Sequence, residues 1–218
     1  HFQKHLKTEP VVIYRGLDAN EFPFNTAIDP QWLQEMQQAH GELLTDKKVL
    51  LPGRLSEIKG AMGLIPWLKS VAKDVCLLVN AKPNESKFSR HFVAALKEAG
   101  VFDKIIWLGV ERNMAQLYAW ADVVMSVNKK PESFGRTVLE ALSVGRPVVA
   151  FNHGGVSEVM EKLFPSGLVA VNDWVALADK IEQFLLNPPV MAAHQSFTIQ
   201  AQFEQTMALY RTHLAERQ

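Results

Sequence analysis

Short runs of apolar, often β-branched residues alternate with amphipathic stretches along nearly the whole chain. Strands that read as continuous apolar runs are buried on both faces, as in parallel sheets. Alternation of such strands with helices is typical of doubly wound α/β folds. The pattern therefore predicts a Rossmann-like parallel sheet of about six strands. The strand candidates are Val11–Tyr14, Val49–Leu51, Val75–Val79, Ile105–Leu108, Val123–Val127, Pro147–Phe151 and Leu168–Val171.

The stretches between these runs predict helices over Gly63–Ala72, Phe88–Ala99 and Met114–Trp120. Within Phe88–Ala99 the apolar residues recur at three- and four-residue steps, as one buried helix face requires. Residues 15–46 predict a loop followed by one helix, Gln31–Ala39. Two prolines near residue 188 interrupt the pattern, and residues 196–215 predict a last amphipathic helix. We therefore expect one Rossmann-like domain over residues 1–190 and a helical tail over residues 191–218.

Composition narrows the classes of function. The 218 residues contain 23 Lys and Arg against 23 Asp and Glu, and the basic residues form no long run. Proteins that bind nucleic acid concentrate basic charge on one face, so we expect no nucleic-acid partner. Cys76 is the single cysteine, which excludes an internal disulfide. The chain starts at His1 without a Met, which predicts a fragment of a longer protein.

The loop after the second predicted strand carries a glycine turn and two cations, Arg54 and Lys59, five positions apart. Ligands of open parallel sheets bind beyond the carboxyl ends of the strands. An arginine can bind phosphate oxygens in a bidentate manner, and a lysine acts as a point charge. The loop therefore suits a diphosphate. The alternative is that both side chains are ordinary surface charges.

The loop after Val123–Val127 leads into a helix predicted to end at Val144, before Gly145. The helix start over Phe134–Thr137 would supply open N–H groups and the positive end of a helix dipole. Glu132 precedes this helix and Glu140 lies within it, and carboxylates readily accept hydroxyl hydrogen bonds. The pair therefore suits sugar and ribose hydroxyls. The alternative makes Glu132 a charge complement to the helix start and Glu140 a solvated surface residue.

A third loop, Phe151–Glu158, also follows a strand and opens a helix. Its glycines, Gly154 and Gly155, suit either a ligand contact or an ordinary strand–helix turn. His153 has no Ser or Asp at the spacing of a known triad. The chain has no D-x-D and no C-x-x-C spacing, and we expect neither a metal nor a cofactor.

Taken together and in order, these motifs resemble the retaining group 1 glycosyltransferases, family four. Those enzymes have a GT-B fold, a pair of Rossmann-like domains with the active site between them. The resemblance covers about residues 10–186 and includes the E-x7-E spacing of Glu132 and Glu140. It rests on Gly53–Leu55 with Lys59–Gly60, Pro131–Gly135 with Glu140–Ala141, Gly145–Ala150, Gly154–Gly155 with Glu158, and Arg15–Asp18, where Arg15 replaces the family's Asn.

The resemblance implies that this chain is the carboxy-terminal, nucleotide-sugar-binding domain of such an enzyme, a hexosyltransferase. It implies that Arg54 and Lys59 neutralise the donor diphosphate, that Glu132 binds the transferred sugar and that Glu140 holds the ribose. The catalytic residues implied are Arg54, Lys59 and Glu132. The two cations would stabilise the leaving group as its negative charge develops, in place of a metal. The donor-binding set implied is Gly16, Arg54, Lys59, Val110, Glu111, Glu132, Ser133, Phe134, Gly135, Arg136, Thr137 and Glu140.

The resemblance also bears on partners. It implies a nucleotide sugar, with UDP as the expected nucleotide, and a glycan or lipid-linked acceptor, as in lipopolysaccharide or other surface-glycan synthesis. The acceptor would be bound by an amino-terminal domain expected to be absent from this chain, and the isolated chain is expected to bind nucleotide weakly and transfer nothing. The whole enzyme is expected to be cytoplasmic, with a peripheral contact at the inner membrane face. Two alternatives remain, a nucleotide-sugar epimerase or phosphorylase on the same fold and a non-catalytic nucleotide-sugar-binding module.

Overall fold

The computed structural model describes residues 10–41 and 47–215. Contacts between residues divide the chain into two compact units. The larger unit spans residues 22–194, and the smaller one combines residues up to 21 with residues from 195 onward. The expected division at residue 190 stays a prediction.

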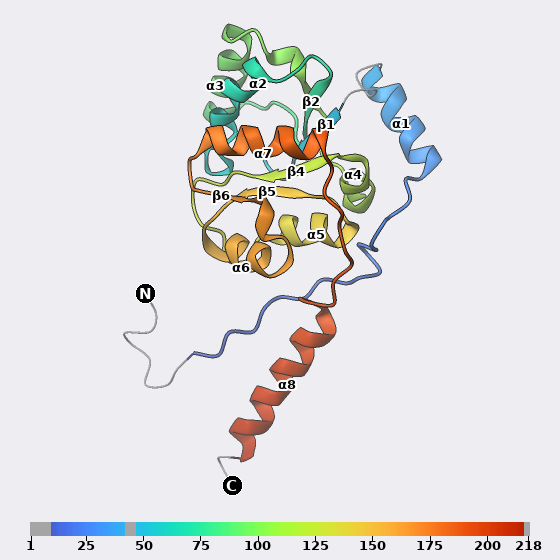
Figure 1. Cartoon of the computed structure of the whole chain (residues 1–218), viewed down its shortest axis with the longest axis vertical. Coiled ribbons are helices and arrows are strands. Elements are labelled where there is room, and N and C mark those ends of the chain that lie inside the picture. Colours follow the sequence, from blue (N-terminus) through green and yellow to red (C-terminus); the bar gives the residue numbers. More distant parts are fainter. Residues whose placement is uncertain (1–9, 42–46, 216–218) are drawn as a thin grey trace. The chain divides into compact units, whose positions relative to one another are not determined.

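The larger unit is built on a six-stranded parallel sheet, as predicted (Figure 1). Its strand order is β3-β2-β1-β4-β5-β6, so the chain runs outward in one direction from β1 and in the other from β4. This order creates a topological switch point between β1 and β4, where open sheets bind ligands. The strands are β1 (Lys47–Leu51), β2 (Val75–Val79), β3 (Ile105–Trp107), β4 (Val123–Ser126), β5 (Val148–Phe151) and β6 (Leu168–Val169).

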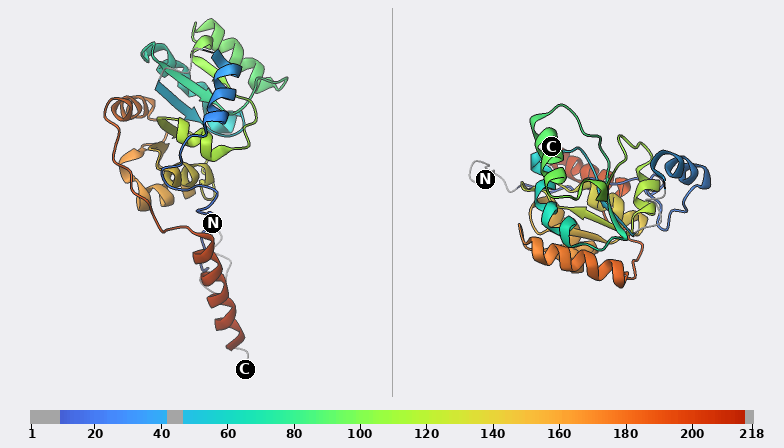
Figure 2. Two further views of the ribbon diagram at one scale, coloured as in Figure 1. Left: turned by 90° about the vertical axis from the view of Figure 1, so that its right-hand side faces the viewer. Right: turned by 90° about the horizontal axis from the view of Figure 1, so that it is seen from above.

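Helices cover both faces of the sheet, which explains why the strands are almost entirely buried. Helices α5 and α6 lie on one side and α7 on the other, and Figure 2 shows the same layers from two further directions. No helix among the described residues is long and apolar enough to cross a membrane. The α-helices are α1 (Pro30–His40), α2 (Ile65–Ser70), α3 (Lys87–Glu98), α4 (Met114–Trp120), α5 (Arg136–Val144), α6 (Gly154–Leu163), α7 (Trp174–Leu186) and α8 (Ile199–Ala215).

Local signals explain where several helices begin and end. Asp29 caps α1, because its carboxylate accepts hydrogen bonds from the backbone of Gln31 and Trp32. Gly145 ends α5 in the left-handed conformation, at φ 87°, which a glycine adopts without steric cost. Four short 3-10 helices complete the described elements: η3 (Glu57–Lys59), η4 (Ala61–Leu64), η5 (Phe102–Lys104) and η6 (Pro165–Gly167).

Two predicted elements differ from the structure. Val11–Tyr14 forms no strand: Val11 and Val12 are 64% and 66% exposed, and the only bridge nearby joins Leu17 to Thr198. The predicted helix Gly63–Ala72 is split into η4 and the shorter α2. Gly60 precedes η4 in the left-handed conformation, and Pro66 stands in the first turn of α2, where a proline is well tolerated.

Candidate functional site

The loops that follow β1 and β4 are fastened together at the switch point. The backbone N–H of Lys129 donates to the carbonyl oxygen of Ile58 at 2.7 Å. Gly60 lies so close to the carbonyl oxygen of Val127 that a Cβ at this position would overlap it. These contacts bring two predicted site residues together, and Lys59 Nζ donates to Glu132 Oε1 at 2.5 Å. Both side chains are about one-quarter exposed, at 23% and 28%, so the ion pair is open to a ligand.

Arg54 lies in the same loop as Lys59. Its side chain is exposed and makes no hydrogen bond or ion pair within the part of the chain that the structure describes. Gly53 has a φ of 100°, and the side chain of Lys59 passes over it. The glycine turn therefore leaves room for the lysine to lie across the loop toward Glu132. A role of Arg54 toward a ligand stays a prediction.

Glu140 is buried, with only 6% of its surface exposed. Its Oε2 accepts a hydrogen bond from the Tyr118 hydroxyl at 2.8 Å, and its Oε1 accepts one from Arg136 Nε at 2.6 Å. The alternative of a solvated surface glutamate is therefore wrong. Each oxygen has a second lone pair, so the carboxylate can still accept hydroxyl hydrogen bonds. Sequence reasoning missed Tyr118, because only the packing of α4 against α5 brings it to Glu140.

The start of α5 has the open form expected from the sequence. Gly135 is its N-cap at φ 85°, and no side chain caps the first turn, which leaves N–H groups available to an anion. Ser133 and Arg136 are exposed, Thr137 is half-buried, and Phe134 is buried. This helix start comes shortly after Glu132 in the sequence, and its role toward a diphosphate stays a prediction.

The paired glycines of the third loop serve packing. Gly155 donates its backbone N–H to the carbonyl oxygen of Glu132 at 2.8 Å. A Cβ on Gly155 would lie 2.6 Å from the backbone nitrogen of Phe134. Helix α6 therefore rests directly on the loop that carries Glu132, and the strand–helix turn is the interpretation that the structure supports.

The remaining predicted site residues make contacts of their own. Val110 is 90% exposed after β3. The Glu111 carboxylate accepts a hydrogen bond from the backbone N–H of Asn113 at 2.7 Å. The backbone N–H of Glu111 donates to Asn80 Oδ1. Gly16 belongs to the smaller unit, where its N–H donates to Gln202 Oε1 at 2.7 Å. Donor roles for these three residues stay predictions.

We expect Tyr118→Phe to lower the free energy of unfolding by about 1–3 kcal/mol at pH 7, because a buried carboxylate loses a hydrogen-bond donor. Burial raises the pKa of Tyr118 well above its usual value, and the neighbouring Glu140 raises it further. The unfolded state therefore loses its tyrosine proton first, and the contribution of Tyr118 to stability falls as the pH rises above about 10.

Urea unfolding between pH 7 and pH 11 measures both effects. The exposed Tyr210 supplies the control Tyr210→Phe, which should match the wild type throughout. If Tyr118→Phe keeps the wild-type free energy of unfolding at pH 7, the hydrogen bond to Glu140 contributes nothing and the assignment is wrong.

Comparison with known families decides the classification. The sequence pattern described as glycosyl transferases group 1 matches residues 34–202, which is more than half of the chain. The chain belongs to this family. The family assignment agrees with the six-stranded half of a GT-B fold and confirms the predicted classification as a glycosyltransferase.

Relatives from several bacteria support the assignment. Spore coat protein SA of Bacillus subtilis is 25% identical over 170 residues, which is 72% of this chain and 44% of that protein. Phosphatidyl-myo-inositol mannosyltransferase of Mycobacterium leprae is 29% identical over 178 residues, 79% of this chain and 46% of that protein. The structure of Anabaena HepE, solved in complex with UDP and glucose, superposes on this chain with a TM-score of 0.79 at 25% identity. The match covers 93% of this chain and 57% of HepE. The chain thus spans about half the length of the group 1 proteins that it matches.

Proposed function

We propose that this chain is the donor-binding part of a retaining glycosyltransferase. The enzyme would move a sugar from a nucleoside diphosphate sugar, with UDP as the nucleotide, to a glycan or lipid-linked acceptor. The observation that carries the proposal is the Lys59–Glu132 ion pair at the switch point of the sheet, beside the open start of α5. A cation for phosphate and a carboxylate for hydroxyls stand next to each other there.

In this proposal the diphosphate binds to Lys59 and Arg54 and to the N–H groups at the start of α5. Negative charge develops on the diphosphate as the bond to the sugar breaks. Cations and helix N–H groups fixed around the phosphates stabilise that charge more in the transition state than in the ground state. The exposed Arg54 side chain is available to bind the phosphates as well.

Glu132 and Glu140 would hold the donor through hydroxyl groups. Glu132 Oε1 is bound to Lys59, which leaves the second oxygen for the sugar. Glu140 is held in place by Tyr118 and Arg136 on one lone pair of each oxygen, which leaves the others for the ribose hydroxyls. In this proposal both carboxylates act as hydrogen-bond acceptors, and neither is assigned as a general base.

The proposal extends to the whole enzyme. The chain spans about half of the relatives it matches, so we propose that a further domain binds the acceptor. We also propose a cytoplasmic enzyme with peripheral contact at the inner membrane face. A relative from Rhizobium meliloti that carries the name of a lipopolysaccharide core biosynthesis mannosyltransferase, 34% identical over 108 residues, supports an acceptor of the surface-glycan kind.

Calorimetric titration of the chain with UDP, GDP and ADP tests the donor site. We expect UDP to bind more tightly than GDP or ADP, with affinity that falls as salt is added, because charge pairs at a partly exposed site are screened. Binding to none of the three would refute the proposal and favour a degenerate module that serves as a scaffold. Tighter binding of GDP or ADP would keep the site and reject UDP as its nucleotide.

A further inference from the structure

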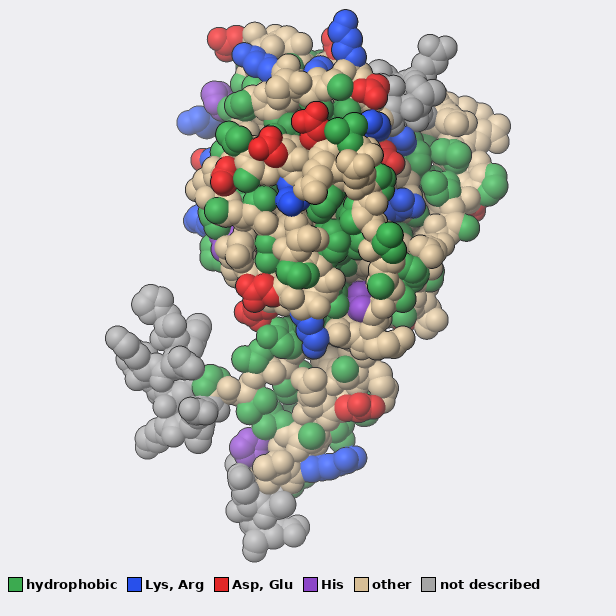
Figure 3. All heavy atoms as spheres, viewed as in Figure 1, with side chains coloured by type: hydrophobic (Ala, Val, Ile, Leu, Met, Phe, Trp, Pro, Cys, Tyr) green, Lys and Arg blue, Asp and Glu red, His purple; other side chains and the backbone are tan. Residues whose placement is uncertain are grey.

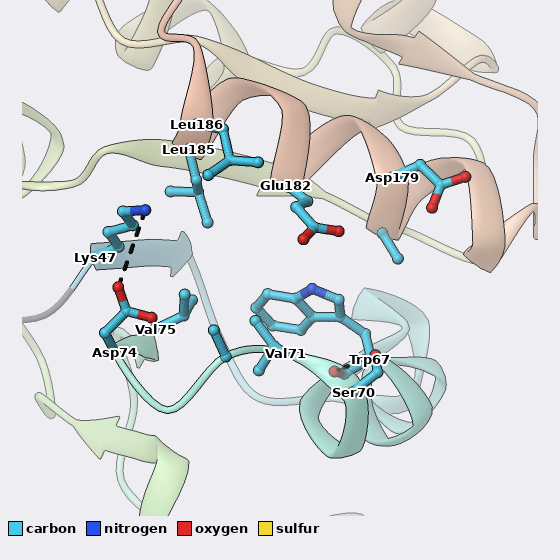
Figure 4. Close-up of a pocket in the computed structure, with 12 residues that line it drawn as sticks. Lys47, Trp67, Ser70, Val71, Asp74, Val75, Asp179, Glu182, Leu185 and Leu186 are labelled. Atoms are coloured by element: carbon cyan, nitrogen blue, oxygen red, sulfur yellow. Dashed lines mark hydrogen bonds and ion pairs between the residues drawn. The ribbon is translucent and has the colours of Figure 1, made fainter.

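A cavity of about 290 Å³ opens between α2 and α7 (Figure 4). Its lining includes Lys47 and Val75, the first residues of β1 and β2. It therefore lies at the amino edge of the sheet, opposite the edge that carries Lys59 and Glu132. The proposed donor site uses none of the residues that line it.

Trp67 supplies an unused hydrogen-bond donor to this cavity. The residue is only 6% exposed, and Figure 4 shows its indole nitrogen on the side of the ring that faces α7. This N–H makes no hydrogen bond with any residue that the structure describes. The N–H opens onto the cavity, and it is not one of the buried side-chain donors that lack a partner among the described residues. It is therefore available to a ligand oxygen inside the cavity.

Two carboxylates from α7 line the cavity, those of Asp179 and Glu182. Figure 4 shows the Glu182 carboxylate over the indole nitrogen and Asp179 further along the same helix. Within the described residues neither makes an ion pair or a hydrogen bond, whereas Lys47 lies 4.0 Å from Asp74. Figure 3 shows acidic side chains gathered on the face of the molecule over α7. The cavity thus has two carboxylates that form no ion pair within the described residues, and these attract a positively charged group.

Apart from Ser70, the rest of the lining is apolar. Val71 and Leu185 flank the ring of Trp67, and an aromatic face binds both C–H surfaces and cations. A volume of about 290 Å³ is near the lower end of small-molecule pockets, which run from roughly 300 to 1,000 Å³. The occupant must therefore be small, with an apolar face.

We propose that this cavity binds a small hydroxylated organic ammonium compound of about the size of an amino sugar. The ammonium group lies between Asp179 and Glu182. The C–H face of the ligand packs on the ring of Trp67, and a hydroxyl oxygen accepts the hydrogen bond from Trp67 Nε1. The cavity is separate from the proposed donor site. The test of this proposal therefore does not depend on whether the chain binds UDP.

The test uses NMR of the tryptophan indole N–H signals in the 218-residue chain, with glucosamine as the probe. Glucose is the matched neutral control, because it differs only in the replacement of the ammonium group by a hydroxyl. We expect glucosamine to shift the Trp67 signal in a saturable way and glucose to bind at least tenfold more weakly. Trp67→Phe assigns the signal by removing it.

Charge variants complete the test. Glu182→Gln is expected to weaken glucosamine binding by about fivefold. Glu161→Gln, at an exposed position on α6, is the control and should bind as the wild type does. Both positions are on the surface, so the comparison holds even if Trp67→Phe does not fold. The proposal is overturned by the absence of any saturable indole shift, by equal affinity for glucose, or by wild-type affinity in Glu182→Gln.

Discussion

Lys59→Ala is expected to weaken UDP binding by roughly 30- to 100-fold. A hydrogen bond between a charged donor and a phosphate oxygen contributes about 2–3 kcal/mol, and each 1.4 kcal/mol is about a tenfold change in affinity. The structure adds a second cause. Lys59 Nζ neutralises Glu132 in the free protein at 2.5 Å, so its removal leaves a bare carboxylate beside the diphosphate. Lost attraction and new repulsion act in the same direction.

These two causes can be separated by calorimetry on a double-mutant cycle. Glu132→Gln removes the repulsion, so Lys59→Ala combined with Glu132→Gln should bind UDP more tightly than Lys59→Ala alone. Lys73→Ala is the charge-matched control, because Lys73 is exposed and precedes β2 at the opposite edge of the sheet. A loss of less than about threefold for Lys59→Ala would contradict a direct contact with phosphate.

The sheet was predictable because its signal lies within each strand. All five residues of β2 are buried, as its continuous apolar run predicts. Val11–Tyr14 has a similar composition but forms no strand. The prediction failed there because a β-branched run does not reveal whether a neighbouring strand is present to pair with it. Helix boundaries followed caps and glycines closely, and Met114–Trp120 has the predicted bounds.

The candidate site was predictable to the extent that it follows the sheet. Parallel strands place the carboxyl ends of β1 and β4 at one edge of the sheet. Lys59 and Glu132 follow these two strands, so both were expected at this edge. The ion pair between Arg136 and Glu140 is also predictable from the sequence, because residues four apart share a helix face. Tyr118 was not, since its hydroxyl reaches Glu140 only through the packing of one helix on another. The cavity beside Trp67 likewise depends on how α2 and α7 meet.

Gly155→Ala should lower the free energy of unfolding by about 3 kcal/mol, the upper part of the range for overpacking. The expected sign is opposite to that of helix propensity, because alanine at an unhindered helix position is about 1 kcal/mol more favourable than glycine. Gly155 lies in the first turn of α6. A Cβ there would meet only backbone, with Ser133 O at 2.5 Å and Phe134 N at 2.6 Å. No side chain can turn away to relieve the overlap, so α6 and the loop must separate.

That separation would also reach the candidate site, because Gly155 N–H holds the carbonyl oxygen of Glu132. We therefore expect Gly155→Ala to weaken UDP binding together with stability, measured by calorimetry and by urea unfolding followed with circular dichroism. Gly100→Ala is the control: Gly100 has a φ of 68° but open space around its Cβ position. It should cost only the 1–2 kcal/mol of a left-handed residue and leave UDP affinity unchanged. If Gly155→Ala were more stable than the wild type, helix propensity would outweigh packing, and α6 would not be what holds the Glu132 loop in place.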